Sequence, residues 1–212
     1  MHPIQPTLIL ASSSPRRRAL LQDAGYQFRT EVPGIDEVRR KGESPDDFAL
    51  RAAREKAEWI AARLECGPGM AVVLAADTVV VDGDESLGKP RDDDDARRML
   101  AQLSGRTHRV VTGVCLCLAP PGDPAEVTSF LVSTSVTFRT LTPDTIAAYI
   151  ATGEPHDKAG AYGIQGHGGA LVARIDGSYT NVVGLPVEEV VEALRERYSL
   201  LPGPVAGTDS TN

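Results

Sequence analysis

The feature that most constrains the fold is a nearly continuous apolar run from Ala71 to Val81, whose only polar members are Asp77 and Thr78. A strand with one face in water alternates apolar and polar residues, whereas a strand covered on both faces is apolar almost throughout. The run is also far shorter than the roughly 20 residues that a membrane-spanning helix requires. The sequence therefore predicts a buried strand inside an α/β fold.

Other segments carry the signals of helices and of further strands. Capping residues followed by apolar residues at helical spacing predict helices after Ser14, Ser44, Asp92, Thr142 and Pro186. Further strands are predicted at 7–11, 110–118, 130–138 and 170–175, and the run 130–138 alternates as a half-exposed strand does. Strand pairs joined by short turns among crossover helices predict a mixed, twisted β-sheet flanked by helices.

The length of 212 residues suits one large domain or two tightly packed lobes. We predict a single domain over residues 1–201, bilobal with a central cleft. Residues 202–212 are predicted to be a disordered tail.

Charge and cysteine usage limit the partners and the compartment. The formal net charge of -7 disfavours binding to nucleic acid or to an anionic membrane, because both reward a basic surface. Cys66, Cys115 and Cys117 form no CxxC pair and have no histidines at zinc-binding spacing. The apolar stretch 7–11 is too short for the core of a signal peptide, so we expect a reduced, cytoplasmic protein.

Residues 12–18, here called the N-terminal turn, indicate an anion site. Arg16, Arg17 and Arg18 occupy the first turn of a helix, where the helix dipole disfavours cations. Hydroxyl groups of Ser12 and Ser14 stand beside free N–H groups in the same turn, and such a helix end suits phosphate. The alternative is that the serines only cap the helix and the arginines are solvated.

Asp77 and Thr78 interrupt the buried strand, and an unpaired carboxylate costs several kcal/mol to bury. The active-site end of a strand explains such a carboxylate. An aspartate that caps a turn or pairs with a structural arginine is the alternative.

Two lysines are candidates for contact with phosphate. Lys89 lies in GDESLGKP, which nearly matches the P-loop pattern, but Pro90 has neither the hydroxyl for magnesium nor the N–H for phosphate. Lys89 can still reach a phosphate outside a P-loop. Lys56 lies at the margin of a helix's apolar stripe, where it faces either a cleft or water.

Asp36 and Glu37 are candidate ligands for Mg²⁺, which takes one or two carboxylates together with substrate phosphates. The alternative is a solvated pair of loop residues. Asp92 to Asp95 resemble a metal cluster, but they fall in the first turn of a helix, where acids complement the dipole.

The glycines from 153 to 169 predict a functional loop, here called the glycine-rich segment. It lacks the dinucleotide pattern GxGxxG, and its glycines let the backbone approach a flat ligand. Gln165 offers one acceptor and two donors, which suffice to read the O4 and N3–H edge of a uracil or thymine ring.

Taken together, these motifs resemble the Maf family of nucleoside-triphosphate pyrophosphatases, historically called septum-formation inhibitors. The resemblance spans nearly the whole chain. The matching motifs are LASSSPRRRALL at 10–21, IDE at 35–37, REKA at 54–57, ADTVV at 76–80, GKPRD at 88–92, LSGRTHRVVTGV at 103–114, DKAGAYGIQG at 157–166 and GSYTNVVGLP at 177–186.

The resemblance implies hydrolysis of the α-β anhydride of dTTP and UTP with the help of Mg²⁺ or Mn²⁺. It implies that Asp77 is the general base and that Arg16, Thr78 and Gln165 tune the choice of base. Ser12, Arg17, Glu37, Lys56 and Lys89 match positions that hold phosphates or metal. We expect Lys89 and Arg17 to be catalytic, Glu37 and Asp77 to bind the metal, and the substrate-binding set to include Ser12, Ser14, Lys56 and Lys158.

The resemblance leaves a second function open, a nucleotide-binding regulator of cell division and septum formation without significant turnover. We also expect a homodimer. Release of pyrophosphate from a panel of nucleotides separates the enzyme from the regulator.

Overall fold

The computed structural model describes residues 6–64, 70–119 and 125–203, and its centre is a seven-stranded sheet with the order β2-β1-β3-β5-β6-β7. The seventh strand, β4, lies off this path and pairs with β3. The strands are β1 Thr7–Ala11, β2 Arg29–Glu31, β3 Ala71–Asp82, β4 Glu85–Leu87, β5 Thr107–Ala119, β6 Glu126–Phe138 and β7 Val172–Asp176. β1 is parallel to β2 and β3, whereas β3, β5, β6 and β7 pair antiparallel, so the predicted mixed sheet is confirmed.

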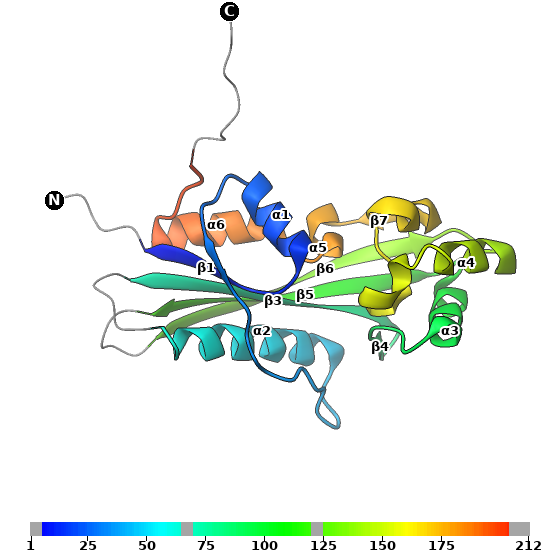
Figure 1. The fold of residues 1–212 in the computed structure, drawn as a ribbon, viewed down its shortest axis with the longest axis horizontal. Coiled ribbons are helices and arrows are strands. Elements are labelled where there is room, and N and C mark those ends of the chain that lie inside the picture. The colour runs from blue at the N-terminus through cyan, green and yellow to red at the C-terminus, as the bar shows by residue number, and fades with distance from the viewer. Residues whose placement is uncertain (1–5, 65–69, 120–124, 204–212) are drawn as a thin grey trace, which may run out of the picture.

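Helices cover both faces of the sheet. In Figure 1, α2 lies along one face, and α1 and α6 lie along the opposite face. The α-helices are α1 Pro15–Asp23, α2 Pro45–Ala61, α3 Asp93–Leu103, α4 Pro143–Ile150, α5 Tyr179–Val183 and α6 Val187–Tyr198. Gly113 of β5 lets α2 pack directly on the sheet, because a Cβ there would overlap the backbone of Ala49. Within the described residues, no helix is long and apolar enough to cross a membrane.

β3 is buried on both faces, as its apolar run predicts. Val72 and Leu74 join the core under α1 and α6, whereas Val73 and Ala75 join the core under α2. A separate core forms where the far ends of β3, β5 and β6 meet α3, α4 and the glycine-rich segment. The long strands thus carry two lobes, one built around α1, α2 and α6 and the other around α3 and α4.

The glycine-rich segment differs from the plain loop that was predicted. It folds into three short 3-10 helices, η1 Glu154–Asp157, η2 Ala159–Ala161 and η3 Gly166–Leu171. The sequence also gave no sign of β2, β4 or α5, because three to five residues are too few for a periodic pattern. α1 is less amphipathic than predicted: Leu21 is buried, but Ala19 is exposed.

The tail is only partly within the described residues. Residues 204–212 lie outside them, and so do Cys66 and the chain before residue 6. The N–H of Gly203 donates to the carbonyl of Gly25 at 2.9 Å. The predicted disorder of 202–212 therefore stays a prediction.

Candidate active site

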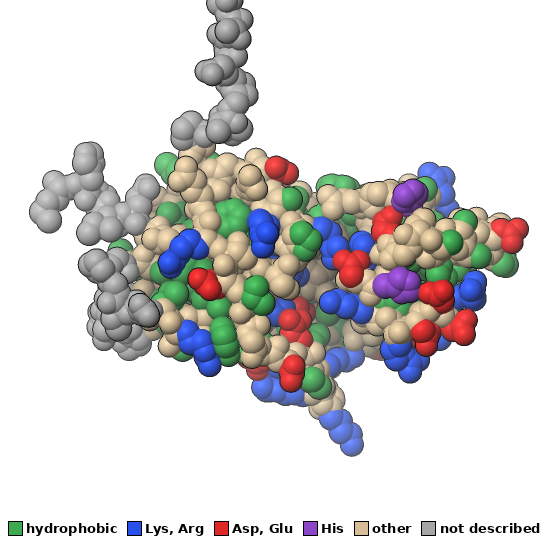
Figure 2. Space-filling view, viewed as in Figure 1, with side chains coloured by type: hydrophobic (Ala, Val, Ile, Leu, Met, Phe, Trp, Pro, Cys, Tyr) green, Lys and Arg blue, Asp and Glu red, His purple; other side chains and the backbone are tan. Residues whose placement is uncertain are grey.

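A cleft of about 390 Å³ lies between the two lobes. Figure 2 shows Lys, Arg, Asp and Glu side chains gathered in the middle of the face that it displays. The predicted residues that line the cleft are Ser12, Ser14, Arg16, Arg17, Glu37, Lys56, Asp77, Thr78, Lys89, Lys158 and Gln165. Residues more than 150 positions apart in the chain therefore meet here. Asp36, the other candidate ligand for Mg²⁺, is exposed and does not line the cleft.

The topology of the sheet opens this cleft. β1 pairs with β3 from Ala71 to Leu74, and β4 pairs with it from Val80 to Asp82. Among the described strands, none pairs with this edge of β3 between the two stretches, and Asp77 and Thr78 lie there. Because side chains alternate along a strand, Asp77 points toward α2 and Thr78 toward α1. The buried strand thus presents two different polar groups to one opening.

The N-terminal turn has the predicted cap. Ser14 is the N-cap of α1 and accepts from the N–H of Arg17 at 3.4 Å, and Pro15 follows as the first helical residue. The hydroxyl of Ser12 is buried and accepts from the N–H of Ser14 at 3.1 Å. Arg16 and Arg17 line the cleft, while Arg18 is exposed outside it. The turn therefore directs two of its three arginines into the cleft.

Arg17 connects both sides of the cleft floor. Its Nε donates to the carbonyl of Gly184 at 2.7 Å, and its Nη2 donates to the Thr78 hydroxyl at 3.1 Å. Burial lowers the pKa of the guanidinium, although Asp77 and Glu37 oppose this shift. Among the described residues, Nη1 makes no hydrogen bond to the protein, so it is the guanidinium nitrogen available to an anion.

A triad of charged residues, two of them buried, lines the cleft. Nζ of Lys56 is 2.7 Å from Oδ1 of Asp77 and 2.8 Å from Oε1 of Glu37. Lys56 is 5% exposed and Asp77 6% exposed, whereas the side chain of Glu37 is 45% exposed. Lys56 therefore faces the cleft, which decides between the two orientations that its helix position allowed.

The two carboxylates of the triad respond to burial differently. Burial raises the pKa of Asp77 above its ordinary value, and Lys56 and Arg17 only partly offset this. Burial also acts to raise the pKa of Glu37, but the charge and hydrogen bond of Lys56 bring it below its ordinary value. One site thus holds an ionised carboxylate beside a more basic one.

These carboxylates are the residues that fit a metal ion. Within the described residues, no group of three or more His, Cys, Asp or Glu side chains could hold a metal. Glu37 and Asp77 converge on a single ammonium group, which shows that both can face one cation. Two carboxylates with phosphate oxygens as further ligands are a donor set suited to Mg²⁺.

The opposite wall of the cleft is the glycine-rich segment. Lys158 donates to the carbonyl of Glu154 at 2.7 Å and to the carboxylate of Asp157 at 2.6 Å. Asp157 also accepts from Arg16 at 2.9 Å, so an ion pair joins the N-terminal turn to this wall. Lys89 and Gln165 are exposed at the cleft surface.

Asp157 was missed as a site residue. It stands beside Lys158 in the motif DKAG, but the sequence does not show that Arg16 lies opposite. Thr112 was missed as well: its hydroxyl is fully buried and lies 2.9 Å from that of Thr78.

The aspartates at 92–95 and the two cysteines of β5 have structural roles, as predicted. Asp92 caps α3, and Asp93 to Asp95 form its first turn. Cys115 and Cys117 are buried core residues.

The chain is similar to known proteins over most of its length. The sequence model of the family described as Maf-like protein matches residues 7–197. The chain is 50% identical over 94% of its length to a dTTP/UTP pyrophosphatase of Anaeromyxobacter sp., also covering 94% of that protein. It is 51% identical over 89% of its length to a dTTP/UTP pyrophosphatase of Salmonella typhimurium, covering 91% of that protein.

Among solved structures, the chain is similar to a nucleoside-triphosphatase, dITP/XTP pyrophosphatase, of Mycobacterium abscessus. The two are 19% identical, with a TM-score of 0.38, over 69% of this chain and 95% of the other.

Proposed function

The chain belongs to the Maf family, and from this premise and the geometry of the cleft we propose that it hydrolyses dTTP and UTP to the nucleoside monophosphate and pyrophosphate. The observation that carries the proposal is the Lys56–Asp77–Glu37 triad beside the N-terminal turn. This arrangement places the buried carboxylate of Asp77, whose pKa is raised, beside cationic groups that can bind a triphosphate. Relatives that are half identical over most of both chains carry the name of this activity.

The triphosphate is held by the N-terminal turn together with the lysines. The start of α1 offers backbone N–H groups and the hydroxyls of Ser12 and Ser14, and Arg17 contributes its unbonded nitrogen. Lys89 and Lys158 reach the same cleft from the other lobe. Charges on both sides suit a ligand that carries several negative charges along its length.

We assign the divalent cation, Mg²⁺ or Mn²⁺, to Glu37 and Asp77. When bound, such an ion neutralises charge on the phosphate oxygens. Glu37 is ionised at neutral pH because its pKa lies below the ordinary value. Lys56 then keeps the two carboxylates close together, which their mutual repulsion would otherwise prevent.

Asp77 accepts the proton from the attacking water. The water oxygen forms a bond to the α-phosphorus, the bond from that phosphorus to the bridging oxygen breaks, and pyrophosphate leaves with the electron pair. A general base is most effective when its pKa approaches the working pH, and in the metal-free protein burial raises the pKa of Asp77. The remaining catalytic effect comes from positioning and from charge.

The nucleobase lies toward the glycine-rich segment. Gln165 is exposed to the cleft and can both donate to and accept from the edge of uracil or thymine. Thr78 adds a hydroxyl on the opposite wall, and Val110, Tyr162 and Val182 supply apolar surface for the ring. Arg16 lies at the entrance between the two walls.

A substrate panel tests this function. Purified protein with Mg²⁺ or Mn²⁺ is incubated with UTP, dTTP, dCTP and dGTP, and pyrophosphate and monophosphate are quantified. We expect pyrophosphate release with UTP and dTTP well above that with dGTP. Release of inorganic phosphate instead would show cleavage of the outer anhydride, and tight binding without turnover would show a regulator; either result contradicts the proposal.

Location and assembly stay predictions from the sequence. The cytoplasmic location rests on the unpaired cysteines, of which Cys115 and Cys117 are buried as free thiols. The homodimer is tested by the mass of the protein in solution.

A further inference from the structure

We propose that Glu154 is a positioning residue that fixes the glycine-rich wall and thereby sets the selectivity of the cleft for the nucleoside. The proposal rests on the proposed function for the identity of the substrate. Glu154 itself does not line the cleft. It acts through the backbone of residues 163–168.

The carboxylate of Glu154 is the centre of a hydrogen-bond cluster. Its Oε2 accepts from the N–H of His167 at 3.0 Å, and its Oε1 accepts from the N–H of Gly168 at 3.3 Å. The hydroxyl of Tyr149 donates to Oε1 at 3.2 Å. The side chain is 17% exposed. Both oxygens are therefore committed to holding a short stretch of backbone.

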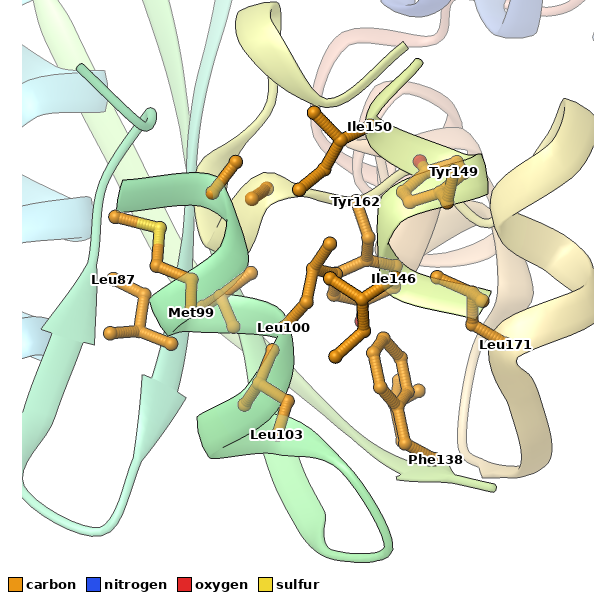
Figure 3. Close-up of a cluster of buried hydrophobic side chains, with 14 of the residues drawn as sticks. Leu87, Met99, Leu100, Leu103, Phe138, Ile146, Tyr149, Ile150, Tyr162 and Leu171 are labelled. Atoms are coloured by element: carbon orange, nitrogen blue, oxygen red, sulfur yellow. The ribbon is translucent and has the colours of Figure 1, made fainter. Parts of the chain in front are cut away.

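Tyr149 extends the cluster to the start of the same stretch. Its hydroxyl accepts from the N–H of Gly163 at 3.1 Å. Figure 3 shows Tyr149 near Ile150, Ile146 and Leu171 in the core of the second lobe. Glu154 and Tyr149 together thus hold both ends of 163–168, and Tyr149 is one of the buried residues of α4.

The glycines let the backbone wrap around this carboxylate. Gly166 has φ +67, and a Cβ there would lie 3.0 Å from Oε2 of Glu154. A Cβ on Gly168 would overlap the carbonyl of Gly163. The close approach accounts for glycine at these positions, since a side chain would push the backbone away from its acceptor.

The anchored stretch carries the cleft wall. Ile164 and Gln165 lie between the anchors at Gly163 and His167, and both line the cleft. The backbone carbonyl of Glu154 also accepts from Lys158, whose stem packs on Gly163. Two cleft-lining side chains thus lie on a stretch that the Glu154 side chain holds, and a third binds the backbone carbonyl of Glu154.

An ionised carboxylate is needed here because two backbone N–H groups point at its two different oxygens. Burial acts to raise the pKa of Glu154, but the hydrogen bonds from Gly168 and His167 bring it below its ordinary value. In a glutamine, one of the two oxygens becomes an NH₂ group, which cannot accept. Glu154→Gln therefore loses at least one backbone anchor at nearly constant volume.

The test compares Glu154→Gln with Glu192→Gln, which makes the same change at an exposed position on α6. We expect the KM for UTP to rise on the order of tenfold and the preference for UTP over dGTP to fall similarly, as loss of a charge-assisted hydrogen bond predicts. The kcat for UTP should change by less than about threefold, because Asp77 and the N-terminal turn are untouched. Amide hydrogen exchange at His167 and Gly168 should accelerate.

Unchanged selectivity together with unchanged exchange at these amides would overturn the proposal. So would a fall in kcat at constant KM, which indicates a role in the chemical step. Should Glu154→Gln fail to fold, Tyr149→Phe decides. It removes the hydrogen bonds of the hydroxyl to Gly163 and to Glu154 but keeps those of Glu154 to His167 and Gly168. KM and selectivity should shift in the same direction by a smaller factor.

A third variant, Gln165→Ala, separates this proposal from the proposed function. If selectivity falls in Glu154→Gln but not in Gln165→Ala, the wall is positioned by Glu154 and the base is read by another group on it. If the unmodified protein does not turn over UTP, the proposed function fails, and exchange at His167 and Gly168 still decides whether Glu154 holds the wall.

Discussion

The two walls of the cleft are built differently. Apart from Glu37, which lies between β2 and α2, the side chains of the N-terminal turn and the triad belong to β3, α2 and the start of α1, which are held by buried apolar cores on both sheet faces. The glycine-rich wall consists of short 3-10 turns that pack on the core of the second lobe, and polar contacts of Glu154, Tyr149 and Asp157 also hold it. We infer that the first wall supplies the chemistry common to all nucleotides, while the second discriminates among bases and can be changed at lower risk to the fold.

The largest effect should come from the first wall. Asp77→Asn removes the proton acceptor and keeps the volume, so kcat for UTP should fall by about 10² to 10⁴ while the fold is retained. Steady-state kinetics and circular dichroism measure the two properties. Asp84→Asn, at an exposed turn, is the matched control. Full activity in Asp77→Asn would show that Asp77 is not the general base.

The second prediction concerns the stability of the same wall. Lys56→Met leaves Asp77 and Glu37 facing each other without their shared cation. Breaking a buried ion pair lowers the free energy of unfolding by about 3 to 5 kcal/mol, although the exposure of Glu37 reduces this. Urea unfolding measures the loss, with Lys41→Met as the exposed control. A loss no larger than in the control would show that the first wall does not depend on this lysine.

The third prediction addresses the support of the second wall. His108 is 2% exposed, and its Nε2 lies 2.8 Å from the hydroxyl of Tyr162. Burial lowers the pKa of His108 to about 4. The unfolded chain binds a proton on this histidine near pH 6.5, whereas the folded protein binds it only near pH 4. The free energy of unfolding should therefore be highest above pH 6.5 and should decrease as the pH drops from 6.5 to 4.

Between pH 6.5 and 4 the free energy of unfolding should decrease by roughly 3 kcal/mol. Urea unfolding at several pH values measures it, and His108→Gln should show a flatter dependence on pH. If the free energy of unfolding changed equally with pH in His108→Gln and in the unmodified protein, the pH dependence would not come from His108.

The fourth prediction tests discrimination at the second wall. Gln165→Glu replaces a group that donates and accepts with one that only accepts, so the contact with the O4 of uracil or thymine is lost. We expect kcat/KM for UTP to fall on the order of tenfold relative to dGTP, with no change in stability. Gln22→Glu on exposed α1 controls for the added charge. Unchanged relative rates would place the reading of the base on another residue.

The same difference between the walls explains how much could be predicted from the sequence. The run Ala71–Val81 and the caps at Ser14 and Ser44 act locally, so the main strands, the longer helices and the cap of α1 were predicted correctly. The direction of Lys56 was open, because its helix position allowed both a buried and a solvated side chain. Packing of α2 on Gly113 turns it into the cleft.

The second wall could be predicted only as a loop. Its shape follows from contacts between residues distant in sequence, such as Arg16 with Asp157 and Tyr162 with His108. β2 was missed for the same reason, since it is a strand only because Arg29 to Glu31 lie beside β1. β4 pairs locally with β3 and was missed because three residues are too few for a periodic pattern.

The smallest effect should arise where the two walls meet. Asp157 is an exposed carboxylate between Arg16 and Lys158, and although partial burial opposes the shift, hydrogen bonds from Lys158 and Arg16 bring its pKa to about 2. Asp157→Asn keeps an acceptor but removes a negative charge from the entrance of a cleft for polyanions. The KM for UTP should fall by about two- to fivefold at low salt, the range expected of an exposed ion pair, and the difference should shrink as ionic strength screens it. Asp144→Asn, exposed at the start of α4, should leave KM unchanged. A rise in KM that persists at high salt would mean instead that the contact holds the two walls at their working separation.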